Sequence, residues 1–167
     1  MVLKIGEKVI YPNQGVGIIE GICVENIAGS NLEFYRLKMI SGNSTVMIPV
    51  DNISLVGLRK LCNKSELDEL LELLKEVYTD MKTDWKDRYK NNVERMASGS
   101  IFEVAKVLRN LYVLSFGKSL SFREKKMFDR AKDLVVTEIA TVKRQSVSET
   151  KALVEKMLGK TYEEVES

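Results

Sequence analysis

The sequence contains no histidine. Its absence excludes the side chain that most often acts as a general base near neutral pH, together with Ser-His and Cys-His nucleophile pairs. It also excludes most zinc sites. The acidic residues stand mostly at helical spacing from basic ones, which is typical of solvated helix faces and not of paired catalytic carboxylates. We therefore expect a protein that is not an enzyme and needs no cofactor, metal ion or small-molecule ligand.

Cysteine and long apolar segments are also scarce. The two cysteines, Cys23 and Cys62, show no metal-type spacing, and each stands among apolar neighbours, which favours buried free thiols. No apolar run approaches the roughly 18–20 residues that span a bilayer. The first residues lack the basic start and apolar core of a signal peptide. We expect a cytoplasmic protein with no membrane partner.

The charge of the chain is nearly balanced, with a formal net value of +2. An overall electrostatic attraction to nucleic acid is therefore weak. The distribution is more informative, because cations gather in residues 82–95 and 118–132, whereas acids concentrate in 66–72 and 163–166. The chain is therefore not basic overall, but its positive and negative charges are concentrated in different segments.

The first 57 residues have the alternation and turn residues of short strands. The expected strands are 8–11, 16–24, 32–39 and 45–49, separated by the turn signals at 12–15, 28–31 and 41–43. Four or five short strands in this length indicate a small, strongly bent barrel of SH3 or Tudor type.

From about residue 63 the apolar period becomes helical. The pattern predicts five helices in a compact bundle. Their candidate N-terminal caps are Ser65, Thr83, Ser100, Ser121 and Ser146, the last three in capping boxes, with Gly117 and Gly159 as candidate ends. The predicted fold class is thus α+β with two domains, a barrel at 1–60 and an all-α bundle at 61–167.

Trp85 is the only tryptophan, and it stands among cations at the start of a predicted helix. By pattern alone, a core aromatic that anchors the helix is the favoured interpretation. The alternative is an exposed wedge that stacks on an unpaired base or enters a minor-groove step, with Arg88 and Lys90 neutralising phosphates beside it.

The first turns of the helix expected after Ser121 carry Arg123, Lys125 and Lys126. Cations at this end oppose the helix macrodipole, at a cost of roughly 0.3–1 kcal/mol each. They are either a solvated face or a grip on phosphates, and the pattern leaves both interpretations open.

The strand at 45–49 ends on Pro49, which is tolerated at the edge of a sheet but not at its centre. The proline either blunts a barrel edge or ends a strand that adds to the sheet of a partner. Composition does not decide between these interpretations.

Several segments, taken in order from residue 4 to about 140, resemble the CarD/CdnL family of bacterial RNA polymerase-binding regulators. They are KVIYPNQGVG (8–17), MIP (47–49), VGLR (56–59), W-x-x-RYK (85–90), ASG (97–99) and EKKM (124–127). A module similar to the β half also occurs in transcription-repair coupling factor. The combination with the Trp85 segment is the specific part of the resemblance.

The resemblance implies a Tudor-like domain that contacts the lobe of the RNA polymerase β subunit, partly through the strand ending at Pro49. Some members carry basic residues at the positions of Glu25 and Met47. The residues expected at this interface are Glu25, Thr45, Val46, Met47, Ile48 and Pro49.

The resemblance also implies a helical domain that contacts promoter DNA at the upstream edge of the transcription bubble, with Trp85 as the wedge at the fork. Asp87 stands where some members have arginine. The residues expected to bind DNA are Trp85, Lys86, Arg88, Lys90, Arg123, Lys125 and Lys126.

The family stabilises open promoter complexes, often at ribosomal RNA promoters. We therefore expect a monomer associated with the nucleoid that bridges polymerase and DNA with weak sequence preference. Residues 141–167 match the family poorly and receive no predicted role.

Two rival hypotheses belong to other classes. One is an adaptor that binds polymerase or a ribosomal partner through the barrel, with Trp85 buried. The other is an RNA-binding barrel, because the turn at 15–17 is also similar to KOW-type modules of ribosomal proteins.

Overall fold

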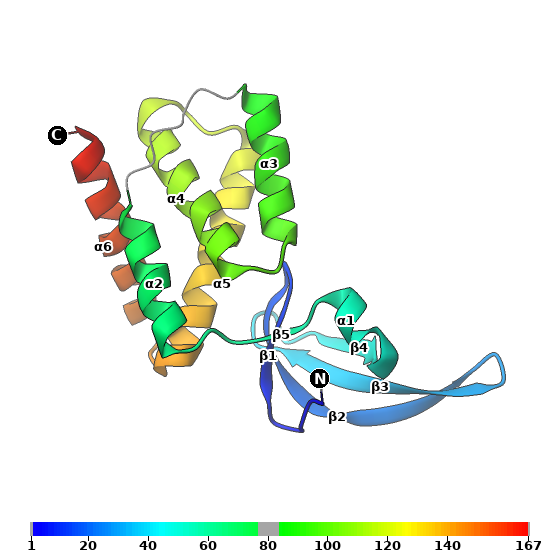
Figure 1. The fold of residues 1–167 in the computed structure, drawn as a ribbon. Coiled ribbons are helices and arrows are strands. Elements are labelled where there is room, and N and C mark those ends of the chain that lie inside the picture. Colours follow the sequence, from blue (N-terminus) through cyan, green and yellow to red (C-terminus); the bar gives the residue numbers. More distant parts are fainter. Residues whose placement is uncertain (1, 77–83, 167) are drawn as a thin grey trace. The chain divides into compact units, whose positions relative to one another are not determined.

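The computed structural model describes residues 2–76 and 84–166, with side chains described up to residue 160. The chain divides into two compact units, Met1–Leu61 and Cys62–Ser167, which we call the β unit and the helical unit. Figure 1 shows their elements. The α+β fold class predicted from the sequence is confirmed.

The β unit is one antiparallel sheet with the strand order β4-β3-β2-β1-β5. Each predicted strand is present, and the second extends three residues beyond its predicted end at Val24. The strands are β1 (Lys8–Tyr11), β2 (Gly15–Ile27), β3 (Ser30–Met39), β4 (Thr45–Pro49) and β5 (Arg59–Lys60). Two short helical turns that the sequence did not predict, η1 (Val50–Asn52) and α1 (Ile53–Val56), follow β4.

The core of the β unit forms between one face of the sheet and α1. Its buried side chains include Val9, Ile19, Tyr35, Leu37 and Ile48. Gly17 lies in register with Met39, and a Cβ atom at this position would approach Leu37 to 2.6 Å. A side chain at this position would therefore have to displace the buried Leu37 side chain.

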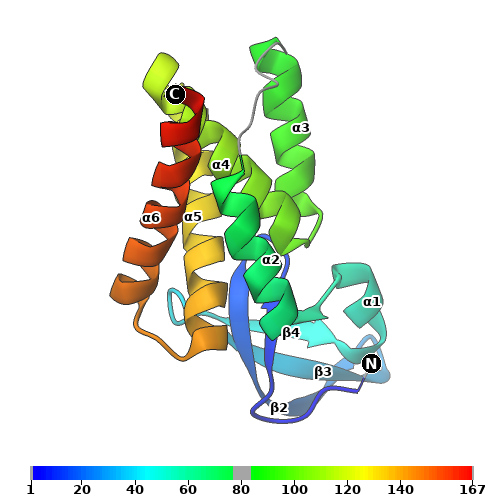
Figure 2. The same ribbon diagram turned by 60° about the vertical axis from the view of Figure 1, so that its left-hand side comes forward.

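The helical unit contains the five helices that the sequence predicted. They are α2 (Lys64–Lys75), α3 (Trp85–Ala97), α4 (Ile101–Gly117), α5 (Phe122–Lys143) and α6 (Val147–Glu166). The apolar helix α4 packs against each of the other four, and Figures 1 and 2 show α2, α4, α5 and α6 running side by side. A hydrogen bond from Lys132 ties α5 to α6 and lowers the pKa of the Glu155 carboxyl.

The helix boundaries correct several predictions. Asn63, and not Ser65, caps α2 and forms a capping box with Glu66. The box predicted at Ser100 is absent, because Ser100 makes no side-chain cap hydrogen bond and Glu103 pairs with Arg95 and Lys106. The predicted cap Thr83 lies outside the described residues.

At the starts of α5 and α6, the structure contains the caps that the sequence predicted. Ser121 caps α5 and forms the predicted box with Glu124. The Ser146 hydroxyl accepts a hydrogen bond from the Glu149 backbone N–H, as expected of a cap. The prediction that Gly159 ends the last helix is wrong, since α6 runs through it to Glu166.

The two cysteines differ in their surroundings. Cys62 is buried, as predicted, whereas Cys23 is only half-buried, because it lies in the part of β2 beyond the core. Among the described residues, none of the helices is both long and apolar enough to cross a membrane.

Glu138 of α5 is a fully buried carboxylate within the helical unit. Its Oε2 accepts a hydrogen bond of 3.2 Å from the Cys62 backbone N–H. The interaction fixes the segment that precedes α2 to the centre of the bundle, because a buried N–H without an acceptor is costly.

We predict that Glu138→Ala lowers the free energy of unfolding by about 2–4 kcal/mol, through the unsatisfied Cys62 N–H and the cavity left behind. Glu138→Gln keeps a side-chain oxygen and is expected to cost less. Urea unfolding followed by the helical circular dichroism signal measures both variants. Equal stability of Glu138→Ala and the parent chain would contradict the assigned role.

Candidate functional site

Two helices of the helical unit begin at the same end of the bundle. Trp85 is the first residue of α3, and Phe122 is the first residue of α5. Both views show the start of α3 and the turn between α4 and α5 at this end. We call it the basic end, after its exposed cations Lys86, Lys90, Arg123, Lys125 and Lys126.

An ion pair between Arg88 and Glu124 joins the first turns of these two helices. The Arg88 Nε and Nη2 atoms donate to Glu124 Oε2 over 3.3 and 3.2 Å. The side chains are only 18% and 8% exposed, so water screens the pair weakly. The pair therefore fixes the start of α3 against the start of α5.

The other oxygen of Glu124 belongs to the capping box of α5. Oε1 accepts from the Ser121 backbone N–H over 3.4 Å, and the Ser121 hydroxyl accepts from the Glu124 N–H over 3.1 Å. One carboxylate thus closes the helix cap and holds the neighbouring helix. Sequence reasoning identified the capping box but not the partner on α3.

The ion pair changes the interpretation of Arg88, which the sequence placed among the phosphate-binding cations. Its guanidinium is largely withdrawn from solvent and is already paired. The same pairing removes the charge of Glu124 from the surface. The acids that stay exposed beside the cations of α3 include Asp84 and Asp87.

Trp85 lies in solvent, with 58% of its surface exposed. Its interpretation as a core aromatic is therefore wrong, and the exposed position agrees with what the family resemblance implied. Lys86 Nζ lies 5.7 Å from the centre of the ring, within range of a cation–π interaction. The exposed ring also counts against an adaptor in which Trp85 is buried.

Phe122 is the residue that sequence reasoning missed. As an apolar residue of the helical pattern after Ser121 it belongs by type in the core, yet it is 72% exposed. Lys126 Nζ lies 4.6 Å from the centre of its ring. Nothing in the local sequence distinguishes Phe122 from Ile101, which is also the first residue of its helix and is buried in the core.

The body of α3 is held to the bundle by few buried residues. Asn92 and Met96 are its buried side chains, and the Asn92 amide nitrogen has no hydrogen-bond partner in the described part of the structure. Val93, an apolar residue within α3, is exposed. The Arg88–Glu124 pair is thus a major attachment of this helix.

In the β unit, the strand expected to face a partner lies at an edge of the sheet. β4 pairs with β3 on one side, and among the described strands it has no neighbour on the other. Cross-strand register places Thr45, Met47 and Pro49 on the outer face, and Met47 is 40% exposed. Val46 and Ile48 point to the core face, so their side chains are turned away from the outer surface.

The hairpin of β2 and β3 continues beyond the core as a ribbon of residues 22–34, which we call the distal ribbon. A bulge between Ile19 and Gly21 keeps Ile22 on the core face after Ile19. Glu25 pairs with Leu32 on the outer face. The ribbon exposes the aliphatic side chains of Ile22, Val24, Ile27 and Leu32.

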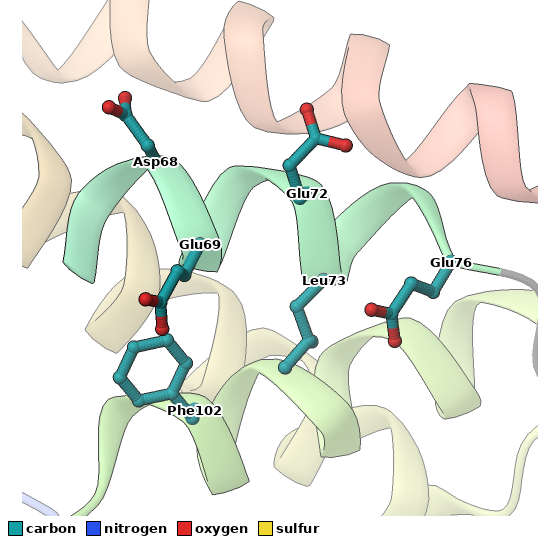
Figure 3. A pocket seen from close by; sticks show the side chains of 6 residues that line it. All are labelled: Asp68, Glu69, Glu72, Leu73, Glu76 and Phe102. Atoms are coloured by element: carbon teal, nitrogen blue, oxygen red, sulfur yellow. The ribbon is translucent and has the colours of Figure 1, made fainter. Parts of the chain in front are cut away.

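A cavity of about 450 Å³, lined mostly by acidic residues, lies along α2. The exposed cations of the basic end belong to other helices, α3 and α5. Figure 3 shows the lining residues of the cavity, which are Asp68, Glu69, Glu72, Leu73, Glu76 and Phe102. Glu76 is paired with the buried guanidinium of Arg109 at 3.1 Å. A surface of this charge repels phosphate, so it is unsuited to nucleic acid. Among the described residues, no group of three or more cysteine, aspartate or glutamate side chains is arranged to hold a metal ion.

Comparison with known proteins assigns both units. The family model described as "CarD-like/TRCF RID domain" matches residues 3–62, and that described as "CarD, C-terminal domain" matches residues 69–155. YdeB of Bacillus subtilis (strain 168), a proposed transcription factor, is 32% identical over 140 residues, which cover 84% of this chain and 92% of YdeB.

Two solved structures are similar to the N-terminal part of the chain. The solution NMR structure of the 72-residue N-terminal domain of Myxococcus xanthus CarD is 36% identical, with a TM-score of 0.31 over 35% of this chain and 77% of that chain. CdnLNt from the same organism is 38% identical, with a TM-score of 0.32 over 36% of this chain and 84% of that chain.

The family models and the extended similarity to YdeB agree along both units of the chain, and this chain therefore belongs to the CarD family of transcription regulators.

Proposed function

We propose that this protein binds the RNA polymerase β subunit through its β unit and promoter DNA through the basic end of its helical unit, and so stabilises the open promoter complex. The observation that carries the proposal is the exposed Trp85 ring among the cations of the basic end. In this proposal a monomer makes both contacts, and neither involves a chemical step.

At the DNA, Trp85 acts as a wedge. Unstacking a base step costs a few kcal/mol, so an inserted ring favours DNA that is already opening. The upstream edge of the transcription bubble supplies such a step. A ring that occupies the fork must leave before the base pairs there can reform, and the open state becomes harder to close.

The exposed cations supply a grip that is independent of sequence. Lys86 and Lys90 stand on α3, and Arg123, Lys125 and Lys126 on α5. Each phosphate contact releases counterions, and this release is the main source of non-specific affinity. Because Arg88 is paired with Glu124, we assign it to positioning α3 and not to binding phosphate.

At the polymerase, the edge strand β4 offers backbone groups for pairing with a strand of the β subunit. Thr45, Met47 and Glu25 offer side chains on the outer face of the sheet. Ile48 is buried, so its contribution is through its backbone and through the shape of the strand.

Each contact alone is weak, and their connection in one chain gives the affinity. Once the β unit is bound, the second contact is intramolecular, with an effective concentration on the order of millimolar for a short connection. The DNA contact can therefore be sequence-independent and still be confined to promoters that polymerase has opened.

We predict that Trp85→Ala shortens the lifetime of the open complex at least about fivefold, the loss expected from one stacking interaction of about 1 kcal/mol. The ring is exposed, so folding and polymerase binding should not change. Decay of the open complex after heparin challenge measures the lifetime. An unchanged lifetime with normal polymerase binding would exclude the wedge.

The double substitution Lys125→Gln and Lys126→Gln is expected to weaken DNA binding and to flatten its dependence on salt. The slope of log affinity against log salt should fall by about 0.9 for each phosphate that the variant no longer neutralises. The double substitution Lys151→Gln and Lys156→Gln, at two exposed cations of α6, is the matched control. If the double variant keeps the full slope, these lysines do not contact phosphate.

Met47→Asp is predicted to weaken polymerase binding at least about tenfold, because a charge would be desolvated at the outer face of β4. Leu55→Asp makes the same change at an exposed apolar residue of α1 and should have little effect. Surface plasmon resonance with immobilised polymerase measures both. Equal binding of the two variants would argue against β4 as the interface.

A further inference from the structure

We infer that Phe122, together with Lys126, is a second base-stacking contact at the melted fork, beside the one made by Trp85. The inference rests on the proposed function, because it assigns another residue of the same DNA-binding end. It extends that function from a single wedge to two rings that contact separate nucleotides.

The first argument is the exposure of the ring. At 72% exposure, Phe122 is more exposed than Trp85, and it contributes little to the core of the bundle. Burial of an aromatic side chain stabilises the folded state, so a ring left in water adds little to the stability of the fold. A ligand that covers the ring would recover that free energy.

The second argument is that the ring repeats the arrangement at Trp85. Lys86 lies over the Trp85 ring, and Lys126 lies over the Phe122 ring at the shorter distance of 4.6 Å. Each pair stands in the first turn or two of its helix. A cation against one face of a ring leaves the opposite face for a base, with the cation close to the phosphates of the same strand.

The third argument is that the two helix starts that carry the rings are held together. Phe122 directly follows the cap Ser121 and stands two residues before Glu124, whose carboxylate binds Arg88 three residues after Trp85. The two rings are thus connected through one nearly buried ion pair and one capping box. A preorganised pair of rings loses little conformational entropy on binding.

Charge selects nucleic acid as the occupant over an apolar protein surface. Phe122 is followed by Arg123, Lys125 and Lys126, all exposed, and the acid between them is withdrawn into the pair with Arg88. An apolar partner would have to desolvate these cations. A strand with unpaired bases supplies both a π-face for the ring and phosphates for the cations.

The test is the affinity of the full chain for fork DNA, measured by fluorescence anisotropy at low salt, with a fluorescent adenine analogue at the first unpaired positions. Phe122→Ala should weaken fork binding about fivefold or more and restore the fluorescence quenched by stacking. Phe122→Trp should bind as well as the parent chain. Phe122→Leu, which keeps apolar area but lacks a ring, should bind as poorly as the alanine variant.

Val147→Ala is the matched control, since Val147 is likewise an exposed apolar residue at the first position of its helix, α6. It should leave fork binding unchanged. Phe122→Ala should change affinity for fully paired DNA less than about twofold, because a closed duplex offers no free base face.

The inference is overturned if Phe122→Ala binds the fork normally, if Phe122→Leu retains full affinity, or if fork and duplex lose affinity equally. Trp85→Ala, measured on the same fork, separates the two proposals. Loss for Trp85→Ala with none for Phe122→Ala would end this inference and leave the wedge intact, whereas no loss for either variant would overturn both.

Discussion

The Arg88–Glu124 ion pair is the interaction on which the functional end of this protein depends. It fixes the start of α3 to the start of α5 and removes the charge of Glu124 from a surface of exposed cations, while the other oxygen of Glu124 closes the cap of α5. Because both side chains are mostly covered, loss of one partner leaves the other charge unpaired where water reaches it poorly, which costs more than the roughly 0–1 kcal/mol of an exposed surface pair. Since Asn92 and Met96 are the buried side chains of α3 and Arg95 pairs with Glu103 of α4 near its other end, the Arg88–Glu124 pair is what holds the first turn of α3, which carries Trp85.

The fold was largely predictable because its periods are clear. Alternation along β3 and the boxed start of α5 are both local signals, and the structure contains both. The unpredicted helix α1 is a single turn, too short to show a period. The end of α6 was misjudged because glycine in a helix interior costs only about 1 kcal/mol, which tertiary packing outweighs.

The candidate site was predictable in its composition but not in its geometry. The cations of α5 are exposed where the sequence placed them, because lysine and arginine are rarely buried without a partner. The pairing of Arg88 and the exposure of Phe122 were not predicted, and the reason is the same for both. A side chain at the start of a helix either meets a neighbouring helix or extends past it. Which of the two occurs depends on where the two helices begin relative to each other, and the local sequence does not contain that information. The exposure of Trp85 was inferred from the family resemblance, against the pattern of its own helix.

The distal ribbon leaves four aliphatic side chains in water, those of Ile22, Val24, Ile27 and Leu32. Their exposure determines the heat-capacity change of any association that covers the ribbon. Covering apolar surface lowers the heat capacity of the system. Any association that buries the ribbon therefore becomes more exothermic and less entropically favourable as the temperature rises. A calorimetric heat-capacity change would report how much of this ribbon a partner covers, independently of the charges at the other unit.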